Sequence, residues 1–237
     1  MAISTILKKL STTIAGAVLI LGVGGAAQAA TMIDTTPSWN GQDSISIFGE
    51  SNTATYGQTF TVGTDNVLND FTFWLDDFNS YNDVVDFAGY VMEWDGTKAV
   101  GDVLYQSEER STTKADGFEQ FTFNTGGINL TSGKKYVSFL SASNFFDGVS
   151  GLSRMGSTRF QGGDVYSGGD FVYNNNGSNF NSLTANNWVS GRFGDAAFKA
   201  SFSSQSVPEP ASILGMLAFG AVGATSALKR KQKNNKA

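Results

Sequence analysis

The chain has 237 residues and a formal net charge of −5, and it contains neither cysteine nor histidine. Without cysteine there are no disulfides, thiol nucleophiles or cysteine-ligated metal sites. Without histidine, a Ser-His-Asp triad and a His-ligated zinc site are also excluded.

The first 29 residues have the three parts of a secretory signal peptide. Lys8 and Lys9 form a short basic region, and an apolar stretch follows from residue 14 to residue 27. Ala27-Gln28-Ala29 then has the small-x-small pattern after which signal peptidase cuts. Because the stretch is short and closes on a cleavage site, we predict that residues 1–29 are removed on export. A retained N-terminal anchor is the alternative.

Residues 30–206 are predicted to form one all-β domain. Short runs at 71–75, 120–123, 137–139 and 198–202 alternate apolar and polar side chains, which is the period of a half-buried strand. Turn pairs such as Asp95-Gly96 separate the runs. This domain shows no sustained 3.6-residue apolar period. We therefore predict a two-sheet antiparallel β-sandwich with a jelly-roll-like topology.

The part of this domain from residue 144 to residue 195 differs in composition. Ten Gly and eight Asn fall within it, and both residue types favour turns. Aromatic side chains still recur there, which is not typical of disordered sequence. We predict a long Gly/Asn-rich loop region, with one or two short strands, that folds onto the sandwich and forms no second domain.

Charge is divided unevenly along the chain. The signal peptide carries two lysines, and the tail from Pro208 carries five Lys or Arg against one Glu. The segment between them holds 9 basic and 20 acidic residues, a net charge of −11. Binding to phosphate backbones needs a basic footprint, so we expect no nucleic-acid partner.

The C-terminal segment, residues 207–237, has the order of a membrane anchor. An apolar run of 18 residues, 211–228, follows Pro208-Glu209-Pro210. As a helix it would span about 27 Å, close to the thickness of the hydrocarbon core. The cytoplasmic stop that follows the run consists of Lys229, Arg230, Lys231 and Lys233. We predict a transmembrane helix with the β-domain outside; a buried helix of a soluble domain is the alternative.

This arrangement resembles the PEP-CTERM sorting signal of bacteria that produce exopolysaccharide. Three ordered elements carry the resemblance: Pro208, Glu209 and Pro210, the apolar segment, and the terminal basic cluster. The resemblance implies that an exosortase, a membrane cysteine protease, recognises the motif and processes the tail. The mature protein would then lie at the cell surface or in the extracellular matrix.

The middle of the chain resembles jelly-roll domains, similar to carbohydrate-binding modules, of exported proteins with this tail. The segments that carry this second resemblance are residues 55–60, 90–96, 103–107 and 132–137. It supports the fold and implies no particular activity.

Two groups of residues have the composition of a carbohydrate site, in which aromatic faces lie beside amides and carboxylates. The first group is Trp39, Asn40 and Asp43, and the second is Tyr173, Asn174, Asn175 and Trp188. Most aromatic residues of the domain must fill the core of a sandwich without disulfides. We expect Trp39 and Trp188 to be exposed, because each lies in polar, loop-like sequence.

Four aspartates within eleven residues are candidate calcium ligands: Asp76, Asp77, Asp83 and Asp86. Ca²⁺ takes about six to eight oxygen ligands, and two asparagines of the same segment could add to these. Neither EF-hand spacing nor a calcium-binding nonapeptide repeat is present. A solvated acidic loop that binds no metal is the alternative. Ca²⁺ is the one cofactor that the sequence suggests.

A glycoside hydrolase needs two carboxylates that face each other across a cleft. Glu93, Glu108 and Glu109 lie in or near predicted strands, but 20 acidic residues give some close pair by chance. No further element of this machinery is visible, so we expect no enzymatic activity.

The leading hypothesis is an exported, surface-sorted, non-catalytic β-sandwich that binds or organises extracellular polysaccharide. Signal peptidase and exosortase are the processing partners, and the C-terminal helix holds the precursor in the membrane. Two alternatives remain: a structural matrix or sheath subunit that acts by protein–protein contacts, and a weak calcium-dependent glycoside hydrolase.

Overall fold

The computed structural model describes residues 31–50, 52–115, 117–159, 163–191 and 193–205. The predicted signal peptide, the motif Pro208 to Pro210, the helix 211–228 and the basic stop at 229–233 lie outside the described residues. Within the described part of the chain, no helix is long and apolar enough to cross a membrane.

The described residues form thirteen strands, a 3-10 turn and one helical turn. In chain order they are β1 (Thr31–Asp34), η1 (Thr36–Ser38), β2 (Ser44–Gly49), β3 (Thr55–Thr61), β4 (Val67–Asp77), β5 (Asp86–Trp94), β6 (Ala99–Gln106), β7 (Arg110–Ser111), β8 (Glu119–Asn129), β9 (Lys135–Ser141), β10 (Leu152–Gly156), β11 (Phe171–Asn174), α1 (Ser182–Ala185), β12 (Val189–Ser190) and β13 (Phe198–Ser203).

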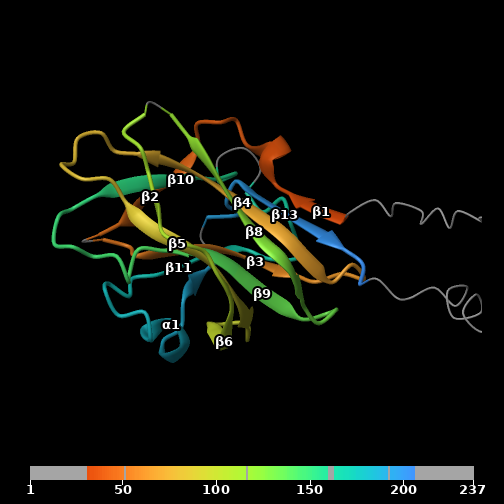
Figure 1. The fold of residues 1–237 in the computed structure, drawn as a ribbon. Coiled ribbons are helices and arrows are strands. Elements are labelled where there is room, and N and C mark those ends of the chain that lie inside the picture. Colours follow the sequence, from red (N-terminus) through yellow and green to blue (C-terminus); the bar gives the residue numbers. More distant parts are fainter. Residues whose placement is uncertain (1–30, 51, 116, 160–162, 192, 206–237) are drawn as a thin grey trace, which may run out of the picture.

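The strands pair into two antiparallel sheets that pack face to face (Figure 1). Sheet A has the order β1-β13-β4-β10-β2, and β8 pairs with the free side of β4. Sheet B has the order β12-β11-β3-β9-β5-β6, and the short β7 also pairs with β5. The predicted all-β sandwich of two antiparallel sheets is therefore confirmed.

Alternation along the strands places the core between the sheets. In β4, Phe71, Phe73 and Leu75 are fully buried and point inward, whereas Trp74 is half-buried on the outer face. The predicted Asp95-Gly96 turn joins β5 to β6: the Asp95 carboxylate accepts the backbone N–H groups of Thr97 and Lys98 at 2.7 and 2.9 Å. Gly96 has the positive φ of 107° that this turn requires.

The outer face of sheet B is covered by a second, smaller apolar layer. Strands β3, β5 and β9 are buried on almost every residue, because side chains from the 174–190 segment pack on the face that points away from sheet A. The members of this layer include Tyr90, Trp94, Phe139, Val172, Leu183 and Trp188. The Gly/Asn-rich region thus folds onto the sandwich as expected, with three short strands and a helical turn where we expected one or two strands.

Both ends of the described chain lie at the same end of the sandwich (Figure 1). Thr31 at the start of β1 is opposite Phe202 near the end of β13. The Asp65 carboxylate accepts hydrogen bonds from the hydroxyls of Thr31 and Ser204, so one side chain joins the two ends. These hydrogen bonds lower the pKa of Asp65, Ser204 contributing most.

Candidate functional site

Three aromatic side chains gather on the solvent-facing side of sheet A. The Trp39 ring lies 5.9 Å from the Trp74 ring and meets the Phe118 ring edge-on at 4.9 Å, measured between centroids. All three are half-buried, so each keeps part of its surface in contact with solvent. They come from the loop after η1, from β4 and from the loop before β8. We call Trp39, Trp74 and Phe118 the aromatic platform.

The loop that carries Trp39 is fixed by its own polar groups. The Trp39 indole N–H donates to the Asp43 carbonyl at 2.8 Å, and the Asn40 side-chain oxygen accepts the backbone N–H groups of Gln42 and Asp43 at 2.9 Å. Below the ring lies Gly156, where an added Cβ would stand 2.7 Å from Trp39 Cζ2. The first predicted group therefore does come together, with Asn40 and Asp43 holding the loop that presents Trp39.

A cation continues the platform toward the end of the sandwich. The Arg154 guanidinium lies 5.6 Å from the Phe118 ring centroid and 5.9 Å from that of Phe78, distances typical of cation–π contacts. Its Nε and Nη2 donate to the same carboxylate oxygen of Asp76, at 2.8 and 2.5 Å. Because Asp76 is buried and Arg154 is partly exposed, the pair holds the guanidinium at the edge of the platform.

Polar side chains of sheet A border the platform on its other side. Gln120 of β8 lies opposite Trp74, and Thr122 lies opposite Thr72. The Gln120 amide donates to the Thr122 hydroxyl at 3.1 Å, and that hydroxyl is 2.9 Å from the hydroxyl of Thr72. Gln120 and Thr122 are exposed. Together they form an ordered row of hydrogen-bonding groups next to an aromatic surface.

The second predicted carbohydrate group is not brought together. Trp188 is only 5 % exposed; its indole N–H donates to the Leu183 carbonyl at 2.8 Å, and its ring packs edge-on against Trp94 and Phe139. Our expectation of an exposed Trp188 was wrong, because the polar sequence around it is the cover of an apolar layer. Its side chain is part of the core.

Tyr173 lies on the opposite face of sheet B from Trp188. Successive residues of a strand point to opposite faces, and the preceding Val172 belongs to the layer with Trp188. The Tyr173 ring accordingly packs near Tyr56 and Phe193. Of its two neighbours in the predicted group, Asn174 is buried and Asn175 is exposed. These four residues do not form one surface.

The four candidate calcium ligands also have separate surroundings. Asp76 and Asp77 are adjacent in β4 and point to opposite faces; Asp76 pairs with Arg154, and Asp77 accepts the Thr112 hydroxyl at 2.5 Å. Burial raises the pKa of Asp77, which opposes the ionised form that a cation needs.

Asp83 accepts the backbone N–H of Val84, and Asp86 accepts the Ser111 hydroxyl, at 2.9 and 2.5 Å. Across the described residues, no three Asp or Glu side chains are placed to hold a metal ion. The predicted calcium group therefore does not fit a Ca²⁺ site, since its first two members diverge.

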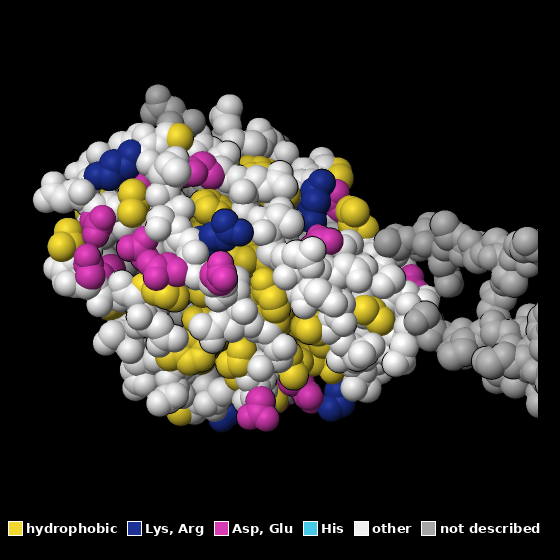
Figure 2. Space-filling view, viewed as in Figure 1, with side chains coloured by type: hydrophobic (Ala, Val, Ile, Leu, Met, Phe, Trp, Pro, Cys, Tyr) yellow, Lys and Arg dark blue, Asp and Glu magenta, His cyan; other side chains and the backbone are white. Residues whose placement is uncertain are grey.

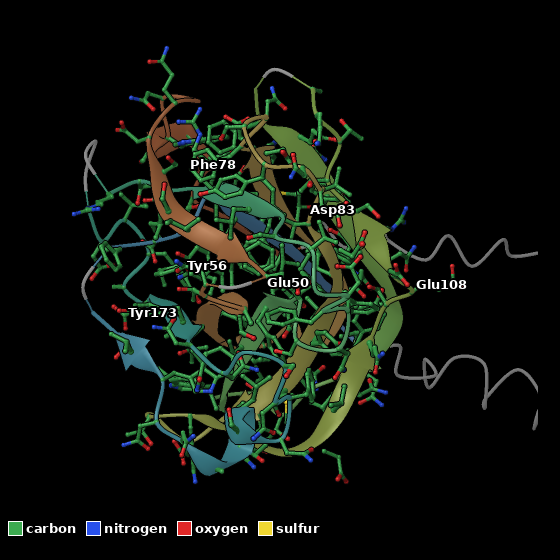
Figure 3. All side chains as sticks on the ribbon, turned by 90° about the vertical axis from the view of Figure 1, so that its left-hand side faces the viewer. Glu50, Tyr56, Phe78, Asp83, Glu108 and Tyr173 are labelled. Atoms are coloured by element: carbon green, nitrogen blue, oxygen red, sulfur yellow. The ribbon has the colours of Figure 1, made fainter. Side chains whose placement is uncertain are left out.

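The candidate carboxylates for hydrolysis are separated along sheet B. Glu93 forms an ion pair with Lys134 at 2.8 Å near one end of β5. Ser107, which precedes Glu108, donates its backbone N–H to the carbonyl of Gly89 in β5. Gly89 lies four residues before Glu93 on the same strand. At about 3.3 Å per residue this separates their backbones by about 13 Å along the strand, and the Glu93 carboxylate is engaged by Lys134. Figure 3 shows Glu108 at the margin of the molecule.

A groove lies where the free edges of the two sheets meet. β8 is an edge strand of sheet A, and β6 and β7 form the neighbouring edge of sheet B. Two adjoining hollows of about 260 and 220 Å³ lie between them and share Arg110, Thr122 and Phe123. Figure 2 shows hydrophobic side chains gathered in a band between the two layers on this face. We call this the edge groove; its lining residues are Tyr105, Ser107, Glu108, Arg110 and the β8 residues 120–124.

Sequence reasoning missed Trp74 and the edge groove for different reasons. The alternation that buries Phe73 and Leu75 places Trp74 on the opposite, polar face of the strand, so its partial exposure could have been predicted from the sequence. The groove depends on which strands stand at the sheet edges, and β6 and β8 become neighbours only through sheet pairing.

A comparison with protein families identifies the C-terminal segment. The model of the PEP-CTERM protein-sorting motif matches residues 206–231. The chain is thus an exported β-sandwich protein that is sorted by an exosortase to the bacterial cell surface. No curated protein matches the chain.

Proposed function

We propose that this exported sandwich is a non-catalytic protein that binds extracellular polysaccharide through the aromatic platform. The observation that carries the proposal is the meeting of Trp39, Trp74 and Phe118, from three separate segments, on the open face of sheet A. Sugars present apolar C–H faces that stack on aromatic rings, while their hydroxyls bond to polar groups at the ring edges. The sorting motif supports the proposal, because it directs the domain to the surface where such polymers lie.

The platform is prearranged for binding. Hydrogen bonds from the Trp39 indole and to the Asn40 side chain fix one loop, and the Asp76 carboxylate fixes Arg154 beside Phe118. Gln120 and Thr122 already form an ordered row next to Trp74. Groups that are ordered before binding lose little conformational entropy on contact with a ligand.

The test uses the full chain in detergent and affinity electrophoresis in gels that contain a soluble β-glucan, a galactomannan, a dextran or an alginate. The variants Trp39→Ala and Trp74→Ala should each weaken retention about tenfold or more, as for a central aromatic residue of an interface. Trp74→Phe keeps a ring and should retain most of the binding. Val149→Ala, an exposed apolar residue in the loop before β10, is the control for general surface changes.

Two results would overturn the proposal. One is a folded wild-type chain that none of these polymers, nor the other polysaccharides of a glycan array, retains. The other is retention that both alanine variants leave unchanged while thermal melts show that they are folded. Sedimentation of the same samples without glycan shows whether self-association, the behaviour of a matrix subunit, occurs instead.

A further inference from the structure

The edge groove is continuous with the aromatic platform across a single strand. Gln120 faces Trp74 across the β4–β8 pair and also lines the groove, as does Thr122. Neighbouring strands lie about 4.8 Å apart, so a ligand stacked on Trp74 needs to cross only the width of β8 to enter the groove. Beyond β8, sheet A has no further strand in the described residues, and this side is open.

The groove combines an apolar floor with polar rims. Phe123 is buried and stacks on Phe71 at 5.0 Å, and Tyr105 meets Phe71 edge-on at 5.8 Å. Phe123 lies directly on Gly89 of β5, where a Cβ would come within 2.7 Å of its ring. The floor is therefore held rigidly between the two sheets.

The rims carry groups that bind hydroxyls. Glu108 and Arg110 are exposed on the sheet-B side, opposite Gln120 and Asn124 of β8. Among the described residues, no carboxylate lies within ion-pair distance of Arg110, whose charge partly offsets the rise in the pKa of Tyr105 that burial causes. A carboxylate acceptor and a guanidinium donor at one rim can together bind neighbouring sugar hydroxyls.

We propose that the edge groove is a second subsite, in which a neutral hexose polymer stacked on the aromatic platform continues across β8 and is held by Glu108 and Arg110. This inference rests on the proposed function. The polymer is assigned as neutral because the segment between the signal peptide and the tail carries a net charge of −11, which repels a polyanion. Within the groove, the charges of Glu108 and Arg110 cancel, so the groove has no net positive charge that would attract a polyanion.

The test is the dependence of affinity on oligomer length, measured by calorimetry on the full chain in detergent. The probes are β-1,4-linked glucose and mannose oligomers of increasing length, with oligouronates from alginate as the charged arm. Affinity of the wild-type chain should rise with length as the ligand reaches the groove. Arg110→Ala and Glu108→Gln should each lower the affinity of the longest neutral oligomers about tenfold, and leave that of the shortest unchanged. Lys135→Ala, an exposed cation on β9, is the matched control.

The outcomes separate the two proposals. No binding of any oligomer or parent polymer defeats the proposed function itself. Binding that strengthens with length but is unaffected by Arg110→Ala and Glu108→Gln refutes the groove subsite and leaves the platform standing. Oligouronates that bind more tightly than the neutral oligomers, and lose this advantage in Arg110→Ala, refute the assignment to a neutral polymer.

Discussion

Asp195 provides the sharpest test of how the Gly/Asn-rich region is held. Its side chain is fully buried just before β13. One carboxylate oxygen accepts the Gln58 amide at 2.7 Å, and the other accepts the backbone N–H groups of Val165 and Tyr166 at 2.8 and 2.9 Å. A single carboxylate thus joins the loop before β11 to strand β3, and replacing it removes all three connections.

The structure sets the size of the effect. Asp195→Ala leaves three donors without an acceptor, the buried Gln58 amide and the part-buried backbone N–H groups of Val165 and Tyr166, and a fully buried donor of this kind costs about 1–3 kcal/mol before relaxation. Since loop movement will recover part of this, we expect a loss of about 3–5 kcal/mol from the free energy of unfolding.

Asp195→Asn is the finer variant. The side-chain oxygen of the new asparagine can accept from the two backbone donors. Its NH₂ group then faces the NH₂ group of Gln58, so two donors meet with no acceptor between them. Turning the Gln58 side chain moves the conflict to the backbone N–H of Ala196, which donates to Gln58 at 2.9 Å. One donor therefore stays unpaired in either arrangement, at a cost of about 1–3 kcal/mol.

The penalty of Asp195→Asn should depend on pH. Burial raises the pKa of Asp195, so the folded state binds this proton more tightly than the unfolded chain does. The wild-type chain therefore loses stability as pH rises from about 3.9, the value for an unfolded aspartate, through the raised folded-state pKa. Asn does not titrate, so the difference in stability between wild type and Asp195→Asn should shrink over this window.

Urea unfolding followed by tryptophan fluorescence between pH 3.5 and 7.5 measures these differences. Gly63→Ala, at an exposed position where a Cβ meets nothing within 4 Å, is the reference for an innocuous change. A loss below about 1 kcal/mol in Asp195→Ala would refute the hydrogen-bond argument. A stability difference between wild type and Asp195→Asn that grows with pH would show that the carboxylate is stabilised, and not penalised, by its site.

Three further substitutions test the packing by the same unfolding assay. Gly89→Ala should cost about 1–3 kcal/mol, because the new methyl group would press on the Phe123 ring, and an effect within about 0.5 kcal/mol would contradict the tight fit. Trp188→Ala should cost about 3–5 kcal/mol as a core truncation; a near-neutral result would mean that the ring is exposed in solution. Asn176→Ala should cost about 1–3 kcal/mol, since it strips hydrogen bonds from the buried hydroxyls of Thr55 and Ser143, and full stability would show that water replaces the amide.

The sequence predicted the parts of the fold that depend on local alternation. The buried side of β4 follows from Phe71, Phe73 and Leu75, and the β5–β6 turn follows from Asp95-Gly96. Trp188 could not be placed in this way, because its partners Trp94 and Phe139 lie about 94 and 49 residues away in sequence. The polar residues around Trp188 face solvent, whereas its own ring packs on the outer face of sheet B. This contact forms only when the segment folds onto the sheet.

The candidate site was predictable to the same degree. Trp39 and the two polar residues that fix its loop, Asn40 and Asp43, lie within five residues of sequence, and the structure brings this local group together. The contact of Trp39 with Trp74 brings the loop after η1 onto strand β4 through packing. The acidic group around Asp76 was misleading because adjacent strand residues diverge. Composition identified the residue types of a binding surface, whereas sheet pairing decided which of them share it.

The placement of the chain ends bears on how these surfaces are used. Val67 at the start of β4 is opposite Ser203 of β13, only three residues before the sorting motif begins at residue 206. Trp74 lies seven residues further along β4, about 23 Å away at 3.3 Å per residue. The edge groove is lined by residues 120–124 of β8, which pair with residues 70–74 of β4, in the half of the strand that leads away from the tail. Both surfaces therefore lie in the part of the sandwich that is remote from the last described residues of the chain. Side chains of the 174–190 segment cover the outer face of β3, β5 and β9 in sheet B, so the platform and the edge groove are the surfaces on which we expect the proposed ligand to bind.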